Sequence, residues 1–147
     1  MMSTATSERP AFTLQDFYLT LFVLFHQLGP RDTSGKHDPF KGVIGVSLIQ
    51  WFFGLTLFMW VQIGFEYRVP LEVWIAPAIG IPLCILNGYF LMTKGKGTAF
   101  EKRFNKFSKK KRITLRSMAI AASVATMIAF YFSITAYHAA FNIHPPT

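Results

Sequence analysis

The sequence contains very few of the residues that build disulfides, metal centres and acidic surfaces. Its one cysteine, Cys84, excludes a disulfide within the chain, and the Cys and His spacing of a zinc site is absent. Asp and Glu together number seven, against fifteen Lys and Arg. We therefore expect no metal and no cofactor, because the histidines are scattered along the chain at His26, His37, His138 and His144.

Charge is also absent from three long apolar runs. Residues 43–65, 73–92 and 117–141 contain no Asp, Glu, Lys or Arg. Each run matches the roughly 20 residues that a helix needs to cross a bilayer. Together with a hydrophobic content of 52%, the runs predict an all-α membrane protein with three transmembrane helices. The lack of Asp, Glu, Lys and Arg in them, with His138 only at the outer boundary of the third run, argues against a proton-coupled transporter or a voltage sensor.

Positive charge is concentrated between the second and third runs. Residues 94–116 hold ten of the fifteen Lys and Arg and a single acid, Glu101. Cytoplasmic segments of membrane proteins carry such an excess. Lys and Arg in the flanking segments number three, one, ten and none along the chain, which predicts an inside N-terminus and an outside C-terminus. A basic segment held between two spans indicates topology and anionic lipid, and we expect no nucleic-acid partner.

The expected organisation has three parts. A cytoplasmic N-terminal region with an interfacial helix precedes the three-span membrane domain, which contains the basic cytoplasmic loop, and an external tail follows it. The boundaries, in that order, are 1–42 with the helix at 14–28, 43–141 with the loop at 93–116, and 142–147.

The N-terminal helix has clear start and stop signals. Thr13 and Asp16 have the spacing of a capping box, and Gly29 and Pro30 follow the last apolar residue. A helix of this length reaches about 22 Å, less than the roughly 30 Å of the hydrocarbon core. We therefore predict an interfacial, half-buried amphipathic helix; a tilted span in a thinned bilayer is the alternative.

The basic loop carries three phenylalanines at helical spacing. Phe100, Phe104 and Phe107 recur at i, i+4 and i+7 and so share one helical face. Such a helix would lie on the inner leaflet with its rings in the acyl boundary and its cations on anionic headgroups. The alternatives are a topology signal alone and a docking site for an acidic cytosolic partner. The cations in question are Lys102, Arg103, Lys106, Lys109 and Lys110.

Small residues recur at every fourth position of the third run. Ala121, Ala125, Ala129 and Ser133 form one stripe, and small residues let helix backbones approach closely in lipid. The stripe predicts a helix-packing face. It serves packing against the first two spans or, alternatively, a homo-oligomer or an interface with a membrane-protein partner.

A few polar side chains interrupt the apolar runs. Gln50, Gln62 and Asn87 are the amides among them, and hydrogen bonds between helices account for such residues; a solute site is the alternative reading. For catalysis the sequence offers only His37 with Asp32 or Asp38, and no catalytic motif accompanies them.

The order of these features resembles small bacterial inner-membrane proteins with three transmembrane helices and a basic cytoplasmic loop. The similar stretches are residues 38–40 (Asp-Pro-Phe), residues 87–90 (Asn-Gly-Tyr-Phe) and residues 100–107. The resemblance implies multi-pass insertion in the bacterial inner membrane, but no activity and no catalytic residue.

Three functions remain open at this stage. The first is a non-catalytic protein that acts through helix–helix contacts with a membrane partner, as an accessory or toxin-immunity-type factor. The second is an oligomeric pore or permease subunit, with the three amides facing the lumen. The third is a membrane enzyme of envelope or lipid metabolism.

Overall fold

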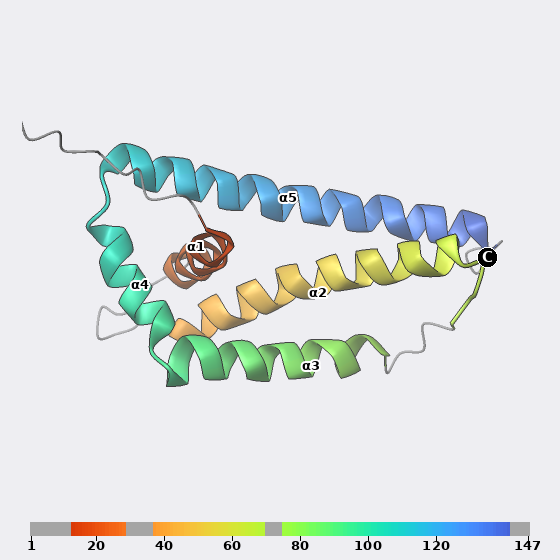
Figure 1. The fold of residues 1–147 in the computed structure, drawn as a ribbon, viewed down its shortest axis with the longest axis horizontal. Coiled ribbons are helices and arrows are strands. Elements are labelled where there is room, and N and C mark those ends of the chain that lie inside the picture. Colours follow the sequence, from red (N-terminus) through yellow and green to blue (C-terminus); the bar gives the residue numbers. More distant parts are fainter. Residues whose placement is uncertain (1–12, 29–36, 70–74, 142–147) are drawn as a thin grey trace, which may run out of the picture.

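The structure is a computed structural model that describes residues 13–28, 37–69 and 75–141. These residues form helices and the short connections between them (Figure 1). The elements are α1 (Leu14–Gln27), α2 (Pro39–Gly64), α3 (Ile75–Gly88), the π-helical turn η1 (Tyr89–Thr93), α4 (Lys96–Asn105) and α5 (Lys109–Ala140).

Three helices are long and apolar enough to cross a membrane. They are α2, α3 continued by η1, and α5. The helix over Ile75–Thr93 has 19 residues, or about 28 Å at the α-helical rise, and the other two are longer. This finding confirms an all-helical protein of membrane character.

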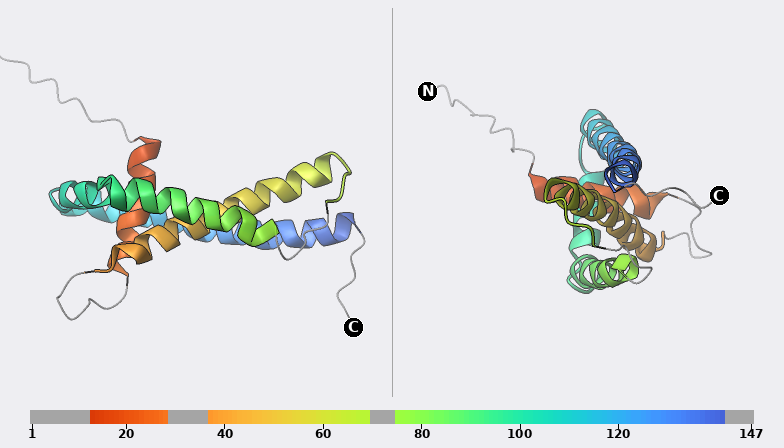
Figure 2. Two further views of the ribbon diagram at one scale, coloured as in Figure 1. Left: turned by 90° about the horizontal axis from the view of Figure 1, so that it is seen from below. Right: turned by 90° about the vertical axis from the view of Figure 1, so that its right-hand side faces the viewer.

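The three long helices lie side by side in a row. In Figures 1 and 2, α2 occupies the middle, with α3 on one side and α5 on the other. The middle helix is half buried, whereas the apolar windows of α3 and α5 are mostly exposed. Among the described residues, α2 is therefore the main neighbour of each outer helix, and much of the surface of α3 and α5 is left uncovered.

The N-terminal helix runs across this row instead of along it. Figure 2 shows α1 crosswise to the long helices, and Figure 1 shows it end-on between α2 and α5. Its predicted capping box is confirmed, because Thr13 accepts from the Asp16 backbone N–H and the Asp16 carboxylate accepts from the Thr13 backbone N–H. Its middle is buried in the protein, from Leu19 to Val23.

A single phenylalanine occupies the centre of this junction. Phe22 is 0% exposed. A Cβ at Gly42 of α2 or at Gly97 of α4 would lie 2.6 Å from a carbon of the Phe22 ring. Gly45 leaves comparable room for Phe25, one turn further along α1. Because real Cβ atoms do not approach so closely, the glycines are what allow α1 to pack against α2 and α4.

The basic segment is not one continuous loop helix. The helix α4 ends at Asn105, and Ser108 caps the next helix by accepting from the Lys111 backbone N–H. The cations from Lys109 to Arg116 therefore form the first turns of α5, which begins well before the predicted span 117–141. The segment predicted as the basic loop, 93–116, thus contains α4, a short connection and the start of α5, and its cytoplasmic position stays a prediction.

The first of the two roles predicted for the small-residue stripe of α5, packing against the other spans, is wrong for three of its four residues; its role as a homo-oligomer or partner interface stays a prediction. Ala121, Ala125 and Ala129 are exposed, and Ser133 alone of the four is buried. The buried face is rotated from the prediction, because α5 packs on α1 near its start and on α2 near its end. The residues buried in α5 are Leu115, Ala119, Ser123, Ser133 and Tyr137.

Candidate functional site

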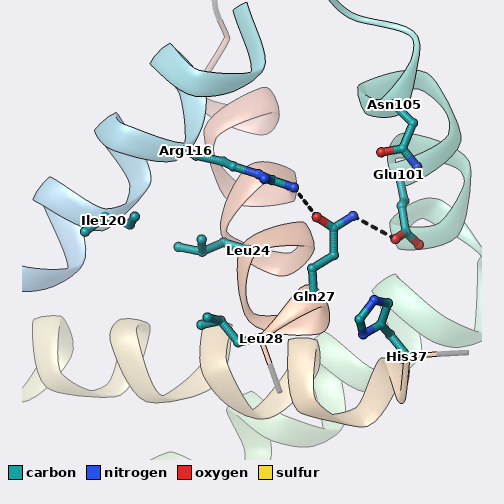
Figure 3. A pocket seen from close by; sticks show the side chains of 8 residues that line it. All are labelled: Leu24, Gln27, Leu28, His37, Glu101, Asn105, Arg116 and Ile120. Carbon is teal, nitrogen blue, oxygen red and sulfur yellow. Dashed lines mark hydrogen bonds between the residues drawn. The ribbon is translucent and has the colours of Figure 1, made fainter. Parts of the chain in front are cut away.

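A polar pocket lies at the end of the molecule where α1, α4 and α5 meet. It has a volume of about 710 Å³ and is shown in Figure 3. Its polar lining comes from Gln27 on α1, Glu101 and Asn105 on α4, Arg116 on α5, and His37. Elements far apart in the sequence thus contribute to one pocket.

Hydrogen bonds join these groups into a chain. Gln27 donates from Nε2 to Glu101 Oε1 at 3.1 Å, and its Oε1 accepts from Arg116. The Arg116 guanidinium also lies over the Phe104 ring, 5.6 Å from its centroid. The amide of Gln27 therefore connects a carboxylate on one side to a guanidinium on the other.

The carboxylate of Glu101 also meets a buried imidazole. Glu101 Oε2 lies 3.2 Å from His26 Nε2, and His26 is 6% exposed. The imidazole stacks on Phe22 and meets the ring of His37 edge-on, with 5.6 Å between centroids. Within the described part of the chain, His26 Nδ1 has no hydrogen-bond partner.

This arrangement presents a donor and an acceptor to the same cavity. Arg116 is exposed at the pocket and offers guanidinium N–H groups, while Glu101 offers carboxylate oxygens. A polar group with both donor and acceptor atoms fits such a lining. In residues 13–28, 37–69 and 75–141, no three His, Cys, Asp or Glu side chains are placed to hold a metal ion.

Of the two acids proposed as partners of His37, the described residues include Asp38. Asp38 is the N-cap of α2, and its carboxylate accepts from the Phe40 backbone N–H at 2.9 Å. Asp32 lies outside the described residues. The acid that shares the pocket with His37 is Glu101. In the sequence Glu101 is distinctive as the one acid among the ten cations of residues 94–116. That feature does not predict which residue Glu101 contacts.

A second polar cluster joins α1 to the long helices. Asn87 donates from Nδ2 to Gln50 Oε1 at 2.7 Å and to Ser47 Oγ at 2.9 Å. Its Oδ1 accepts from the Tyr18 hydroxyl of α1 at 2.7 Å. The predicted interhelical bond between Gln50 and Asn87 is confirmed. Burial raises the pKa of Tyr18 to about 12, so the hydroxyl remains a donor at neutral pH.

The third amide connects α2 to α5 at the opposite end. Gln62 Oε1 accepts from the Val69 backbone N–H at 2.7 Å and lies 3.2 Å from the Tyr137 hydroxyl. Nearby, Trp60 donates from Nε1 to Ser133 Oγ at 2.8 Å. Gln62 and Asn87 are both buried and bonded inside the chain, so the lumen-facing arrangement expected for a pore is wrong for these two residues.

The lipid contacts predicted for two phenylalanines are corrected. Phe100 and Phe104 are 4% and 0% exposed and belong to the core around α1. Their rings gather with Phe107 as the spacing predicted, with centroids 5.9–6.4 Å apart. Because α1 covers this face of α4, the rings meet protein in place of acyl chains.

The cations of the same segment divide into two kinds. Arg103 forms an ion pair with Asp16 of α1, at 2.7 Å between Nη2 and Oδ1. The others in the predicted set are exposed, and their contact with anionic headgroups stays a prediction. They are Lys102, Lys106, Lys109 and Lys110.

No protein-family model matches the chain, and neither a curated protein nor a solved structure matches it. The function is therefore argued from the residues alone.

Proposed function

We propose that this chain is a small, non-catalytic protein of the bacterial inner membrane that acts by binding another membrane protein. In this proposal α2, α3 with η1, and α5 cross the bilayer, with the α1–α4 end in the cytoplasm and the C-terminus outside. The helix α1 then lies in the plane of the inner interface. The excess of Lys and Arg at the α1–α4 end supports this orientation.

The open row of long helices carries the proposal. Among the described residues of α3 only Asn87 is buried, although the helix is strongly apolar. On α5, Ala121, Ala125 and Ala129 leave an exposed strip without bulky side chains. Helices in lipid associate through close packing of such faces, so the outer helices α3 and α5 suit contact with the transmembrane helices of a partner.

Co-purification from the native host in a mild detergent tests the proposal. We expect a membrane protein to be recovered with the wild-type chain. Ala125→Leu is expected to reduce its recovery by a factor of about five or more, because overpacking a helix contact costs roughly 1–3 kcal/mol. Val124→Leu, at the neighbouring exposed position, is the matched control and should retain the partner.

A strictly monomeric protein recovered without any partner would contradict the proposal. Recovery of a second copy of this chain, lost in Ala125→Leu and kept in Val124→Leu, would identify the partner as a homo-oligomer. Equal loss in both variants would show that α5 is sensitive to any enlargement and would remove the small-residue strip as the contact.

A membrane enzyme is the second candidate, and one observation favours it. The buried His26 contacts Glu101, which lines the polar pocket with Arg116, an arrangement that suits general acid–base chemistry. Under this candidate His26→Gln abolishes the protein's function in the host, whereas Asp38→Asn, at the exposed cap of α2, does not. Full function in His26→Gln would end it.

A further inference from the structure

An apolar groove follows α1 where it crosses the long helices. Its volume is about 870 Å³, within the range of sites that hold small molecules or cofactors. The walls come from α1, α2, the end of α3 with η1, and α5. Most of the lining is apolar and includes Leu21, Ile49, Leu86 and Ala122. Such a lining excludes a polar solute and suits a hydrocarbon chain.

The groove opens toward the side that hydrocarbon would cover. Phe53 and Leu86 line it and are 55% and 64% exposed. Both belong to helices long and apolar enough to cross a membrane. A ligand with an acyl chain can therefore enter sideways from the bilayer without passing through water.

Several polar side chains line this groove, and three of them form a hydrogen-bonded cluster. In this cluster of Tyr18, Gln50 and Asn87, the Asn87 amide bonds to the other two and to Ser47. Among the hydrogen bonds of the described residues, none uses Gln50 Nε2. The Gln50 amide N–H₂ is thus available as a donor in a largely apolar groove.

Two lysines lie over aromatic rings that line the groove. Lys94 Nζ lies 5.3 Å from the centroid of the Tyr89 ring, and Lys96 Nζ lies 4.7 Å from that of Phe90. Both rings line the groove. The lysines are exposed, so their ammonium groups contact water on one side and the aromatic rings of the groove on the other.

The acids of the neighbouring elements do not neutralise these lysines. Asp16 on α1 pairs with Arg103, and Glu101 on α4 meets His26. The part of the groove beside these lysines therefore carries net positive charge next to an apolar channel.

We propose that this groove binds one anionic phospholipid. An acyl chain lies along the apolar wall, the phosphate meets Lys94 and Lys96, and the Gln50 amide donates to an ester carbonyl. The apolar lining matches the acyl chain, the free Gln50 donor matches the ester carbonyl, and the two lysines match the phosphate. The occupant is a lipid and not a free phosphate, because the cations flank a hydrocarbon-sized channel. This inference is independent of any protein partner.

Native mass spectrometry of the full chain, released from detergent with added lipid, tests this site. The probe is an equimolar mixture of phosphatidylglycerol and phosphatidylcholine with identical acyl chains. We expect one phosphatidylglycerol to be retained preferentially. Lys94→Gln with Lys96→Gln should reduce that preference by about fivefold per lysine removed. Lys109→Gln with Lys110→Gln removes the same charge elsewhere on the basic segment and should leave the preference unchanged.

Two further measurements separate the parts of the lipid. Ala122→Phe fills the groove and should abolish retention of both lipids, and circular dichroism and gel filtration check that this variant folds. Gln50→Leu keeps the groove open but removes the donor, and it should weaken lipid retention. This second variant tests the site even if Ala122→Phe does not fold. Inorganic phosphate at millimolar concentration should not displace the lipid. Equal retention of the two lipids, equal effects of both lysine pairs, or displacement by phosphate would each overturn the proposal.

Discussion

The ring of Phe22 is held where two helices approach it through glycine. Gly42 and Gly97 come from α2 and α4, which are distant in the sequence, and each faces this ring across a gap too small for a methyl group. Phe22 also stacks on His26, the imidazole that meets Glu101. One buried ring thus determines both the position of α1 and the geometry at the polar pocket.

Gly42→Ala and Gly97→Ala are expected to destabilise the protein by about 1–3 kcal/mol each, because the added methyl group displaces the Phe22 ring from a close-packed core. Thermal unfolding in detergent measures the effect. Gly54→Ala is the control, since a Cβ there meets nothing within 4 Å and alanine favours helix by up to about 1 kcal/mol. Equal behaviour of all three variants would show that Phe22 is not confined by the glycines.

Tyr18→Phe tests the contact between α1 and Asn87. The variant leaves Asn87 Oδ1 without its donor, and we expect a loss of about 1–3 kcal/mol. The pKa of Tyr18 is raised to about 12 by burial, so its contribution is complete below pH 10 and is lost as pH rises from about 10 to 12. Denaturant unfolding should show that the free energy of unfolding of the wild type falls between pH 8 and pH 11, and that it falls less in Tyr18→Phe. Tyr131→Phe, at an exposed position, should behave as wild type.

The sequence predicts single residues well where the partner is also polar and rare. Hydrogen bonding between helices was predicted correctly for Gln50 and Asn87, because few other polar groups in the apolar runs can satisfy them. Tyr18 was not predicted as their third member, because nothing in the sequence shows that α1 crosses the other helices. The importance of Gly42 and Gly97 could not be predicted either, because it depends on the Phe22 ring that packs against them in the folded protein.

At the scale of the elements, α1 contacts α4 through a polar pair near each of its ends. Asp16 near its start binds Arg103, and His26 near its end lies against Glu101. The acid is on α1 in the first pair and on α4 in the second. A shift of α1 along its axis would break both pairs, so these contacts favour one register of this helix.

Glu101→Gln is expected to loosen the end of α1 that carries His26. The neutral amide replaces a charge-assisted contact, which we estimate at about 1 kcal/mol or about fivefold in local opening. Hydrogen–deuterium exchange of the backbone amides of α1 measures this opening. Lys102→Gln is the matched control at the next, exposed position; equally fast exchange in that variant would contradict a role for Glu101.

The positions of the helices in the sequence were predicted better than which face of each helix is buried. The spacing of apolar and capping residues gave α1 and the three long helices to within a few residues, apart from the early start of α5. Ala121, Ala125 and Ala129 do not pack inside the chain, and their contact with a partner stays a prediction. Small residues mark a face able to approach another helix closely, and the sequence does not say whether that helix belongs to the same chain.

At the scale of the whole molecule, the two ends of the helix row differ in kind. One end contains α1, α4 and the cations of the basic segment (Figure 1). At the other end α2 and α5 are joined through Gln62 and Tyr137, and Tyr67 is exposed beside them. Exposed aromatic residues favour the headgroup level, and a cationic end favours the cytoplasm. The apolar length between the two ends matches the hydrocarbon core.

Cysteine labelling in intact cells tests this arrangement most directly. In a Cys84→Ser background, Tyr67→Cys and Lys110→Cys place single thiols at the two ends of the row. A membrane-impermeant maleimide should label the thiol at position 67 in intact cells and the thiol at position 110 only after lysis. Labelling of position 110 in intact cells, or of both positions equally before lysis, would contradict a protein that spans the bilayer with its basic end inside.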